Sequence, residues 1–239
     1  MIDWVRAVDH FLVYGGAYVV AAFVLSLATG ARHGKARLTS FRQSAREAAW
    51  SLTSSAIFVA LGMLVLWLKS RGFTKIYFDI EARSIEYLAA SVVLMLVIHD
   101  SYFYWSHRLM HWGPLFRHAH RLHHGFRQPS PWAAFAFHPL ETLIEAGAMF
   151  VIVFSIPTHP VAFMTFSLIM TFWSSMIHAE NDLLPSWLRK SPIGKMIISA
   201  SDHGLHHRKA SVNYGLYSSL WDALLGTLHR EPRIQRPAL

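Results

Sequence analysis

The chain of 239 residues contains no cysteine. This absence excludes a disulfide framework, a thiolate zinc site, a cysteine-ligated iron–sulfur cluster and a cysteine nucleophile. Charge is also scarce, because Asp, Glu, Lys and Arg make up 15% of the residues, against about 25% in typical soluble domains. Hydrophobic residues make up 53%, more than one soluble core of this length can bury. The composition therefore argues against both a disordered chain and an ordinary soluble enzyme.

Long apolar runs are what the chain has in abundance. Five of them approach the ~20 residues that an α-helix needs to cross a bilayer. They cover residues 11–31, 48–68, 87–105, 142–156 and 161–177. The last two are short and close together, which predicts a hairpin of two spans or a pair that dips into the membrane. We do not expect a secretory signal in the first run, which is long for one and has no basic segment before it.

These runs predict an all-α fold, an integral membrane helical bundle of four to five spans or half-spans with a cytoplasmic, histidine-rich helical cap. No internal repeat, low-complexity tract or linker divides the sequence. We therefore expect a single membrane domain over residues 1–239. Within it, residues 1–90 would form the N-terminal spans and residues 91–230 the histidine-box region.

Basic residues predict how the chain is oriented. Beside apolar runs, the formal charge of +8 indicates loops at the anionic cytoplasmic leaflet rather than a surface for nucleic acid. With the N-terminus outside, seventeen of the 22 Lys and Arg residues lie on the cytoplasmic side, and the opposite orientation leaves five there. The segments 106–141 and 178–239 are then both cytoplasmic, where they can meet.

Histidine is the remaining anomaly, with sixteen residues, thirteen of them between His99 and His207. Three clusters use helical spacing, so that rings at i, i+3 and i+4 converge on one face. The clusters are His107 with His111, then His120, His123 and His124, then His203, His206 and His207. Eight imidazoles in three such clusters are typical of two metal ions. Imidazole binds iron, zinc, copper and nickel, so the ligand type does not choose the metal.

The alternative interpretation is that these histidines bind no metal. A single His-x3-His pair is common by chance, and a histidine-rich basic loop can face solvent or lipid headgroups. Two copies of His-x2-His-His and one His-x3-His, all on the same predicted side of the membrane, favour the metal site.

The residues around the clusters carry a resemblance to a known family. The motifs are Asp100-x3-Tyr104-Trp105-x-His107-Arg108-x2-His111, His120-x2-His123-His124, Phe137-His138-Pro139, Ile177-His178 with Asp182, His203-x2-His206-His207, Asn213-Tyr214-Gly215, and Trp221-Asp222 before Gly226-Thr227. Over residues 99–229 the chain resembles the fatty acid hydroxylase/sterol desaturase family of membrane di-iron oxygenases. The Ser130-Pro131-Trp132-Ala133 and Ala136-Phe137-His138-Pro139 stretches are most similar to the sterol C5-desaturase branch.

The resemblance implies two iron ions that activate O2 as co-substrate. The implied metal ligands are the eight cluster histidines, with His138 and His178 as further ligands or close neighbours. We expect carboxylates to accept the other ring N–H and fix each tautomer. The candidates are Asp100, Glu141, Asp182 and Asp202. His99 and His118 are out of helical phase with the clusters and are weaker candidates for that outer role, while His10, His33 and His159 are expected to be structural or surface residues.

The leading functional hypothesis is an oxidoreductase that hydroxylates or desaturates a C–H position of a lipid, either sterol-like or fatty-acyl. Both reactions begin with loss of a hydrogen atom from the lipid, so the clusters do not separate them. A metal transporter is one alternative, but it predicts ionisable residues in the middle of the spans. A membrane zinc hydrolase is another, but such sites usually need three protein ligands.

Reductive O2 activation also requires electrons from outside the substrate. The sequence has no G-x-G-x-x-G fingerprint for a flavin or nicotinamide and no cysteine for an iron–sulfur cluster. We therefore expect an external ferredoxin- or cytochrome-type electron donor. Basic residues near the clusters would form its docking surface or would meet anionic membrane lipids. They are Arg117, Arg121, Arg127, Arg208 and Lys209.

Overall fold

A computed structural model describes residues 4–33, 40–179 and 182–230. Five long helices dominate it, and the predicted all-α class is confirmed. They are α1 (Trp4–His33), α2 (Phe41–Ser70), α3 (Ile85–Met110), α6 (Pro139–Ser155) and α7 (Pro160–Ile177). Within the described ranges, β-structure is limited to two isolated bridges.

Three of these helices, α2, α3 and α7, are long and apolar enough to cross a membrane. Helix α6 has 17 residues, and α1 contains a shorter apolar stretch, Gly15–Gly30. Large apolar side chains on the spans are exposed, including Trp67 on α2, Val93 and Val97 on α3, and Phe172 on α7. Such side chains suit a lipid environment, and the chain is a multi-pass membrane protein.

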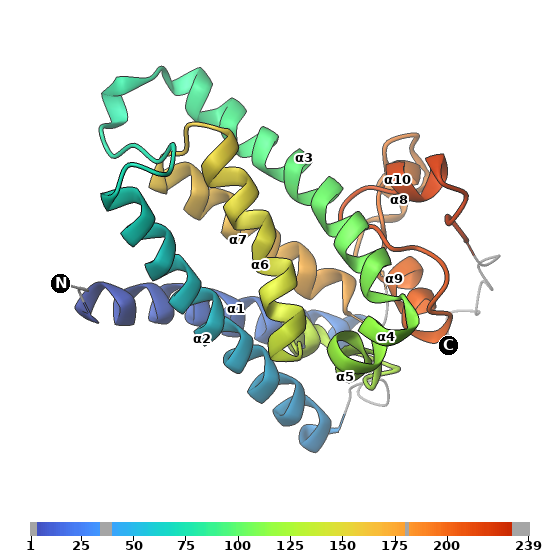
Figure 1. The fold of residues 1–239 in the computed structure, drawn as a ribbon. Coiled ribbons are helices and arrows are strands. Elements are labelled where there is room, and N and C mark those ends of the chain that lie inside the picture. Colours follow the sequence, from blue (N-terminus) through green and yellow to red (C-terminus); the bar gives the residue numbers. More distant parts are fainter. Residues whose placement is uncertain (1–3, 34–39, 180–181, 231–239) are drawn as a thin grey trace.

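Figure 1 shows how the long helices assemble. Helix α3 packs against α6 and α7, α2 packs against α6 and α1, and α1 crosses α7. The start of α6 and that of α7 use the same device. His138 and His159 each accept, through Nδ1, the backbone N–H two residues later, and a proline follows in the first turn. Proline is tolerated there because its missing N–H would have had no helical partner.

Two connections meet at one end of the bundle. The segment after α2 pairs with the α6–α7 turn through a bridge between Ile76 and Thr158, and Lys75 N donates to Val153 O at 2.8 Å. The histidine clusters lie at the other end of α3. The chain therefore separates a connecting end from a histidine-rich end.

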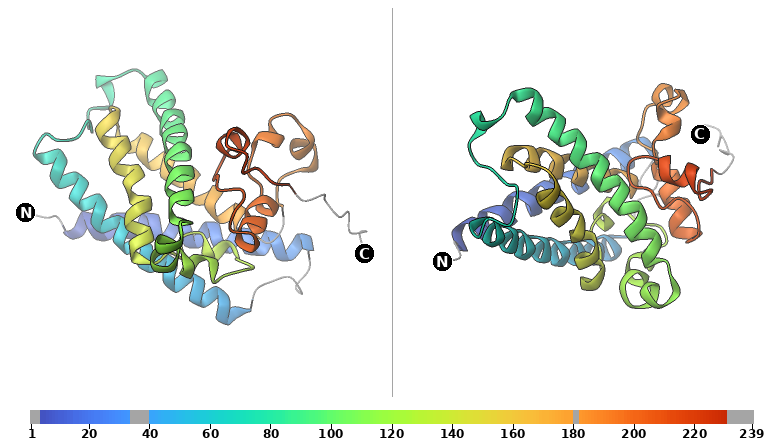
Figure 2. Two further views of the ribbon diagram at one scale, coloured as in Figure 1. Left: turned by 45° about the vertical axis from the view of Figure 1, so that its right-hand side comes forward. Right: turned by 45° about the horizontal axis from the view of Figure 1, so that its top comes forward.

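Short helices form the histidine-rich end. They are α4 (Gly113–Leu115), α5 (Arg121–His124), α8 (Ser186–Lys190), α9 (Ala200–Arg208) and α10 (Leu220–Leu224), with a π-helical segment η3 (Phe116–His120) and the 3-10 turns η4 (Pro131–Ala133) and η5 (Gly194–Met196). A third 3-10 turn, η2 (Ile80–Ala82), precedes α3 at the connecting end. In both views of Figure 2, α8, α9 and α10 gather on one side of the C-terminal half of α3.

The loop around η4 is anchored on the first two helices. Ser51 Oγ donates to Trp132 O at 2.9 Å and accepts from Phe135 N at 3.2 Å. Tyr18 Oη donates to the same Trp132 carbonyl at 2.7 Å. These bonds hold the Phe135–Phe137 segment beneath α7, where it forms part of the site described next.

Candidate metal centre

Nine histidines converge in two groups within the part of the chain that the structure describes. In each group, one ring nitrogen from every residue lies within 4.8 Å of the others. The first group consists of His107, His111, His120, His124 and His206, and the second of His123, His178, His203 and His207. All nine are buried except His111, which is partly buried. These are the eight cluster histidines and His178.

Each His-x2-His-His motif divides its histidines between the two groups. His120 and His124 enter the first group, while His123 enters the second. In α9 the division is reversed, because His203 and His207 enter the second group and His206 the first. Residues at i and i+4 share a helix face, and the ring at i+3 turns to the neighbouring group. The two groups are thus built from interleaved segments and form one unit.

Hydrogen bonds at Nδ1 fix several of these rings. His107 Nδ1 lies 2.8 Å from Tyr214 O, His206 Nδ1 lies 2.7 Å from Val212 O, and His178 Nδ1 lies 2.7 Å from Ser174 O. A carbonyl oxygen only accepts, so Nδ1 must carry the hydrogen and Nε2 must present a lone pair. That tautomer is the one a metal ion at Nε2 requires.

The facing Nε2 atoms test whether a metal ion fits. His107 Nε2 lies 3.0 Å from His120 Nε2, His124 Nε2 lies 3.1 Å from His206 Nε2, and His178 Nε2 lies 3.1 Å from His203 Nε2. Ions with metal–nitrogen bonds of about 2.1 Å hold adjacent ligand atoms about 3.0 to 3.4 Å apart. The donor set and its spacing therefore fit a metal ion in each group.

Burial keeps the rings neutral, as metal ligands must be. Desolvation, reinforced by neighbouring imidazoles, lowers the pKa well below the ordinary value for five of them: His120, His123, His203, His206 and His207. Burial also lowers the pKa of His124 to about 4 and that of His178 to about 4. Protons therefore compete weakly with a metal ion for these rings near neutral pH.

The structure brings one of the four proposed carboxylates to a ring. Glu141 Oε1 lies 2.7 Å from His120 Nδ1, and both side chains are 1% exposed. Asp100 instead accepts from Tyr217 N and Ser218 N, at 3.0 and 3.1 Å. It therefore fixes the C-terminal loop against α3.

The other two carboxylates serve α9. Asp182 accepts from Ser201 N at 3.1 Å, and Asp202 forms a capping box with Ser199 at the start of that helix. Both position the helix that carries His203, His206 and His207.

The remaining histidines also have defined places. His138 lies outside both groups and caps α6, His118 is exposed, and His159 Nε2 lies 3.2 Å from Phe78 O. The side chains of His10 and His33 lie outside the described residues. His99 faces a cavity, described below.

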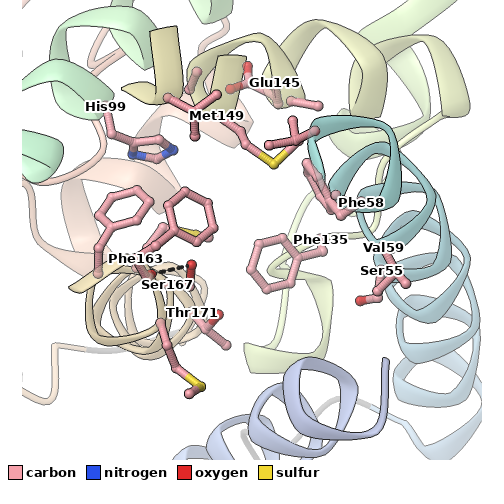
Figure 3. Close-up of a pocket in the computed structure, with 18 of the residues that line it drawn as sticks. Ser55, Phe58, Val59, His99, Phe135, Glu145, Met149, Phe163, Ser167 and Thr171 are labelled. Atoms are coloured by element: carbon pink, nitrogen blue, oxygen red, sulfur yellow. Dashed lines mark hydrogen bonds between the residues drawn. The ribbon is translucent and has the colours of Figure 1, made fainter. Parts of the chain in front are cut away.

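An apolar cavity of about 350 Å³ lies between α2, α3, α6 and α7. Figure 3 shows side chains of these helices and Phe135 pointing into it, with His99 and Glu145 at one edge. A small cavity of about 10 Å³ touches His107, His120, His123, His178 and His203. Five residues line both cavities: Phe103, Phe137, Glu145, Ser174 and Leu216. The apolar cavity therefore ends at the histidine groups.

Glu145 is a site residue that the sequence analysis did not identify. It lies one helical turn after Glu141, is 7% exposed, and accepts from Ser106 Oγ at 3.0 Å. The signal was present, because an ionisable residue within an apolar span marks function by default.

The histidine-containing part of the chain is similar in sequence to a known protein family. Residues 92–227 match the model of the fatty acid hydroxylase family. The chain belongs to the fatty acid hydroxylase family. Curated relatives of this family member include a Delta(7)-sterol 5(6)-desaturase of Gibberella zeae, 32% identical over 68% of this chain and 48% of the relative. A lathosterol oxidase of Rattus norvegicus is 31% identical over 67% of this chain and 52% of its own length.

A lathosterol oxidase of Homo sapiens is 27% identical over 70% of this chain and 55% of its own length. The chain thus spans about half the length of the curated relatives it matches. No solved structure matches this hydroxylase family member.

Proposed function

We propose that this protein is an O2-dependent di-iron oxidoreductase that hydroxylates or desaturates a C–H position of a lipid. The observation that carries the proposal is that the apolar cavity shares five wall residues with the small cavity that touches both histidine groups. A lipid chain or ring system in that cavity would present a carbon to the histidine groups and remain shielded from water.

Iron bound to the two groups would supply the reductive activation of O2. The protein's own contribution is positioning. Phe103 and Phe137 form apolar walls between the two cavities and would hold the reacting carbon. Glu145 and Ser106, hydrogen-bonded to each other, add a polar pair beside the same point.

A sterol-like lipid is the substrate class we propose. The cavity volume of about 350 Å³ falls within the ~300–1,000 Å³ typical of small-molecule sites, and its walls are largely hydrophobic. The relatives named above are sterol 5(6)-desaturases and lathosterol oxidases, which favours sterols over acyl chains.

The alternatives fit the geometry less well. A hydrolytic zinc site usually keeps three protein ligands and an open position, whereas here five and four imidazoles gather in buried groups. A transporter needs a polar path along the spans, whereas the wall between them is apolar.

We also propose that the histidine end faces the cytoplasm and receives electrons from a ferredoxin- or cytochrome-type donor. The basic-residue count supports the orientation. Arg117, Arg121, Arg127, Arg208 and Lys209 are exposed around the histidine segments, and such cations would attract an acidic donor.

The test is to purify the protein in lipid nanodiscs, measure bound iron, and follow O2-dependent conversion of a Δ7-sterol with a ferredoxin, its reductase and NADPH. We expect about two iron ions per chain and sterol product. His206→Ala, which removes a histidine from the same group as His107, should abolish turnover. His118→Ala, an exposed histidine outside both groups, should retain it. Full activity of His206→Ala would contradict the proposal.

A further inference from the structure

The few polar side chains of the large cavity are mostly satisfied by the backbone. Ser55 Oγ donates to Ser51 O at 2.9 Å, and Ser167 Oγ donates to Phe163 O at 2.8 Å. Ser174 Oγ donates to Ala134 O at 3.1 Å. These hydroxyls have already used their hydrogens, so none of them has a donor left for a bound lipid.

His99 differs from this group. It lies inside span α3, is 8% exposed, and lines the cavity, where Figure 3 shows its imidazole pointing into the open space. Its Nδ1 lies 3.0 Å from Tyr217 Oη. Among the residues described by the structure, Nε2 has no hydrogen-bond partner. A buried imidazole nitrogen that faces a cavity without a partner is costly unless a ligand satisfies it.

The surroundings of Tyr217 decide which ring nitrogen carries the hydrogen. Burial raises the pKa of the Tyr217 phenol well above its ordinary value, and the nearby Asp100 carboxylate raises it further. The phenol therefore keeps its hydrogen and must donate it. Its acceptor within the described chain is His99 Nδ1, which leaves the ring hydrogen on Nε2. His99 thus offers an N–H donor to the cavity.

Asp100 holds this arrangement in place. Its carboxylate accepts the backbone N–H groups of Tyr217 and Ser218 and the Ser218 hydroxyl. Asp100 directly follows His99 on α3. The same helix therefore carries the histidine and the carboxylate that holds the Tyr217 phenol against it. A donor held this firmly is suited to selecting a ligand by one polar atom.

We propose that His99 Nε2–H binds the single polar oxygen, a hydroxyl or ketone, of an otherwise apolar lipid in the cavity. The inference rests on the proposed function and narrows its substrate class. His99 precedes the ligand His107 by eight residues, or ~12 Å along the helix. The bound oxygen and the oxidised carbon would therefore lie within about that distance of each other in one molecule.

The position of His99 within α3 disfavours lipids with large headgroups. His99 lies fourteen residues after the start of α3 and eleven before its end, so it is roughly 16–21 Å from either end of the helix. A phospholipid headgroup stays at the membrane surface, whereas His99 lies six residues, or ~9 Å, inside the end of the apolar run 87–105. A sterol or another monohydroxylated ring lipid has a polar group small enough to be buried there.

The experiment compares two lipids that differ in one oxygen. The iron-loaded protein in nanodiscs is titrated with a 3-hydroxylated Δ7-sterol and with its 3-deoxy hydrocarbon, and equilibrium binding and turnover of each are measured. We expect the wild type to bind the hydroxysterol about tenfold more tightly. In His99→Phe, the hydroxysterol affinity should fall to that of the hydrocarbon, and hydrocarbon affinity and iron content should stay the same.

Further variants keep the test decisive if His99→Phe misfolds. His99→Gln restores an N–H donor and should recover part of the preference for the hydroxysterol. Tyr217→Phe releases the tautomer and should reduce the preference. Ser167→Ala is the matched control, because its hydroxyl lines the same cavity but is bonded to the backbone, and it should keep the full preference.

The outcomes separate this inference from the proposed function. Equal binding of the two lipids by a wild type that still turns them over would overturn the inference and leave the function standing. Retention of the preference by His99→Phe, with its loss in Glu145→Gln, would also overturn it. A wild type without iron and without O2-dependent turnover would refute the proposed function itself.

Discussion

Replacing Asp222 with alanine should release the ring of His107, a candidate metal ligand, by freeing the loop that Asp222 anchors. Asp222 is completely buried. Its carboxylate accepts from Tyr214 N at 2.9 Å, Gly215 N at 2.8 Å and Thr227 Oγ1 at 2.7 Å. These bonds fix the loop whose Tyr214 carbonyl orients His107.

The magnitude follows from those three bonds. Hydrogen bonds to a charged group contribute about 1.5–3 kcal/mol each, and leaving buried donors unpaired adds to the loss. Because the loop partly relaxes, we expect a total of about 3–5 kcal/mol, a lowering of the apparent Tm on the order of 10 °C for a chain of this length. Loss of a partner that orients a ligand typically costs about 10–100-fold in metal affinity.

The assay is iron content after equilibration with a chelator series, together with thermal unfolding in nanodiscs. Asp222→Asn keeps one acceptor oxygen and should lose less iron affinity and less thermal stability than Asp222→Ala. Asp79→Ala is the control, because Asp79 is an exposed cap of η2 at the opposite end of the bundle. Unchanged iron affinity and Tm in Asp222→Ala would refute the link between this carboxylate and His107.

Three further predictions address the metal groups, the packing and the orientation. In the first group, three rings have Nδ1 partners, those of His107, His120 and His206, whereas in the second group Nδ1 has no partner within the described chain in His123, His203 and His207. A chelator should therefore empty the second group first, at about a tenfold lower chelator concentration. Simultaneous loss of both ions in Mössbauer or absorption titrations would contradict this. A side chain at Gly147 would overlap the Tyr102 hydroxyl, so Gly147→Ala should lower the free energy of unfolding by about 1–3 kcal/mol. In the double variant, Tyr102→Phe should restore part of that free energy, and thermal unfolding would measure both effects. Because the chain has no cysteine, single introduced cysteines can report the orientation. A cysteine in place of the exposed Lys209 should react with an impermeant maleimide only after the cells are opened, whereas one in place of the exposed Phe73 should react from outside. The reverse labelling pattern would contradict the proposed orientation.

The sequence predicted the helices well because apolar length and helical spacing are local properties. Four of the five predicted runs lie within α1, α2, α3 and α7, and the run 142–156 extends one residue beyond the end of α6 at Ser155. The histidine clusters were equally visible, since two i, i+3, i+4 patterns and one i, i+4 pattern place rings on defined helix faces. What the spacing did not contain was the division of each His-x2-His-His motif between two groups. That division depends on how α9 and the η3–α5 segment face each other, which is a tertiary property.

The partners of the rings were predicted less well, for two physical reasons. Backbone carbonyls of Tyr214, Val212 and Ser174 hold three of the rings, and any residue has a carbonyl, so the side-chain identity gives no signal. Asp100 lies on the same helical stripe as His107, but seven residues separate the two by ~10 Å along the axis, too far for a contact between their side chains. Asp100 therefore reaches the C-terminal loop instead.

The charge of the proposed centre explains why the ligands occur where they do. Nine neutral imidazoles would leave two metal cations uncompensated, and Glu141 is the carboxylate found beside a ring in the described chain. Three helices direct their C-terminal ends to the same place: α3 through His107 in its last turn, α7 through His178 at its C-cap, and α9 through His206 and His207 in its last turn. The C-terminal end of a helix carries a partial negative charge and stabilises a nearby cation by about 0.3–1 kcal/mol when exposed and up to ~2 kcal/mol when partly buried. Placing the ligands at helix ends therefore offsets part of the cationic charge without adding carboxylates, and it leaves the apolar flanks of α3 and α7 free to form the walls of the lipid cavity.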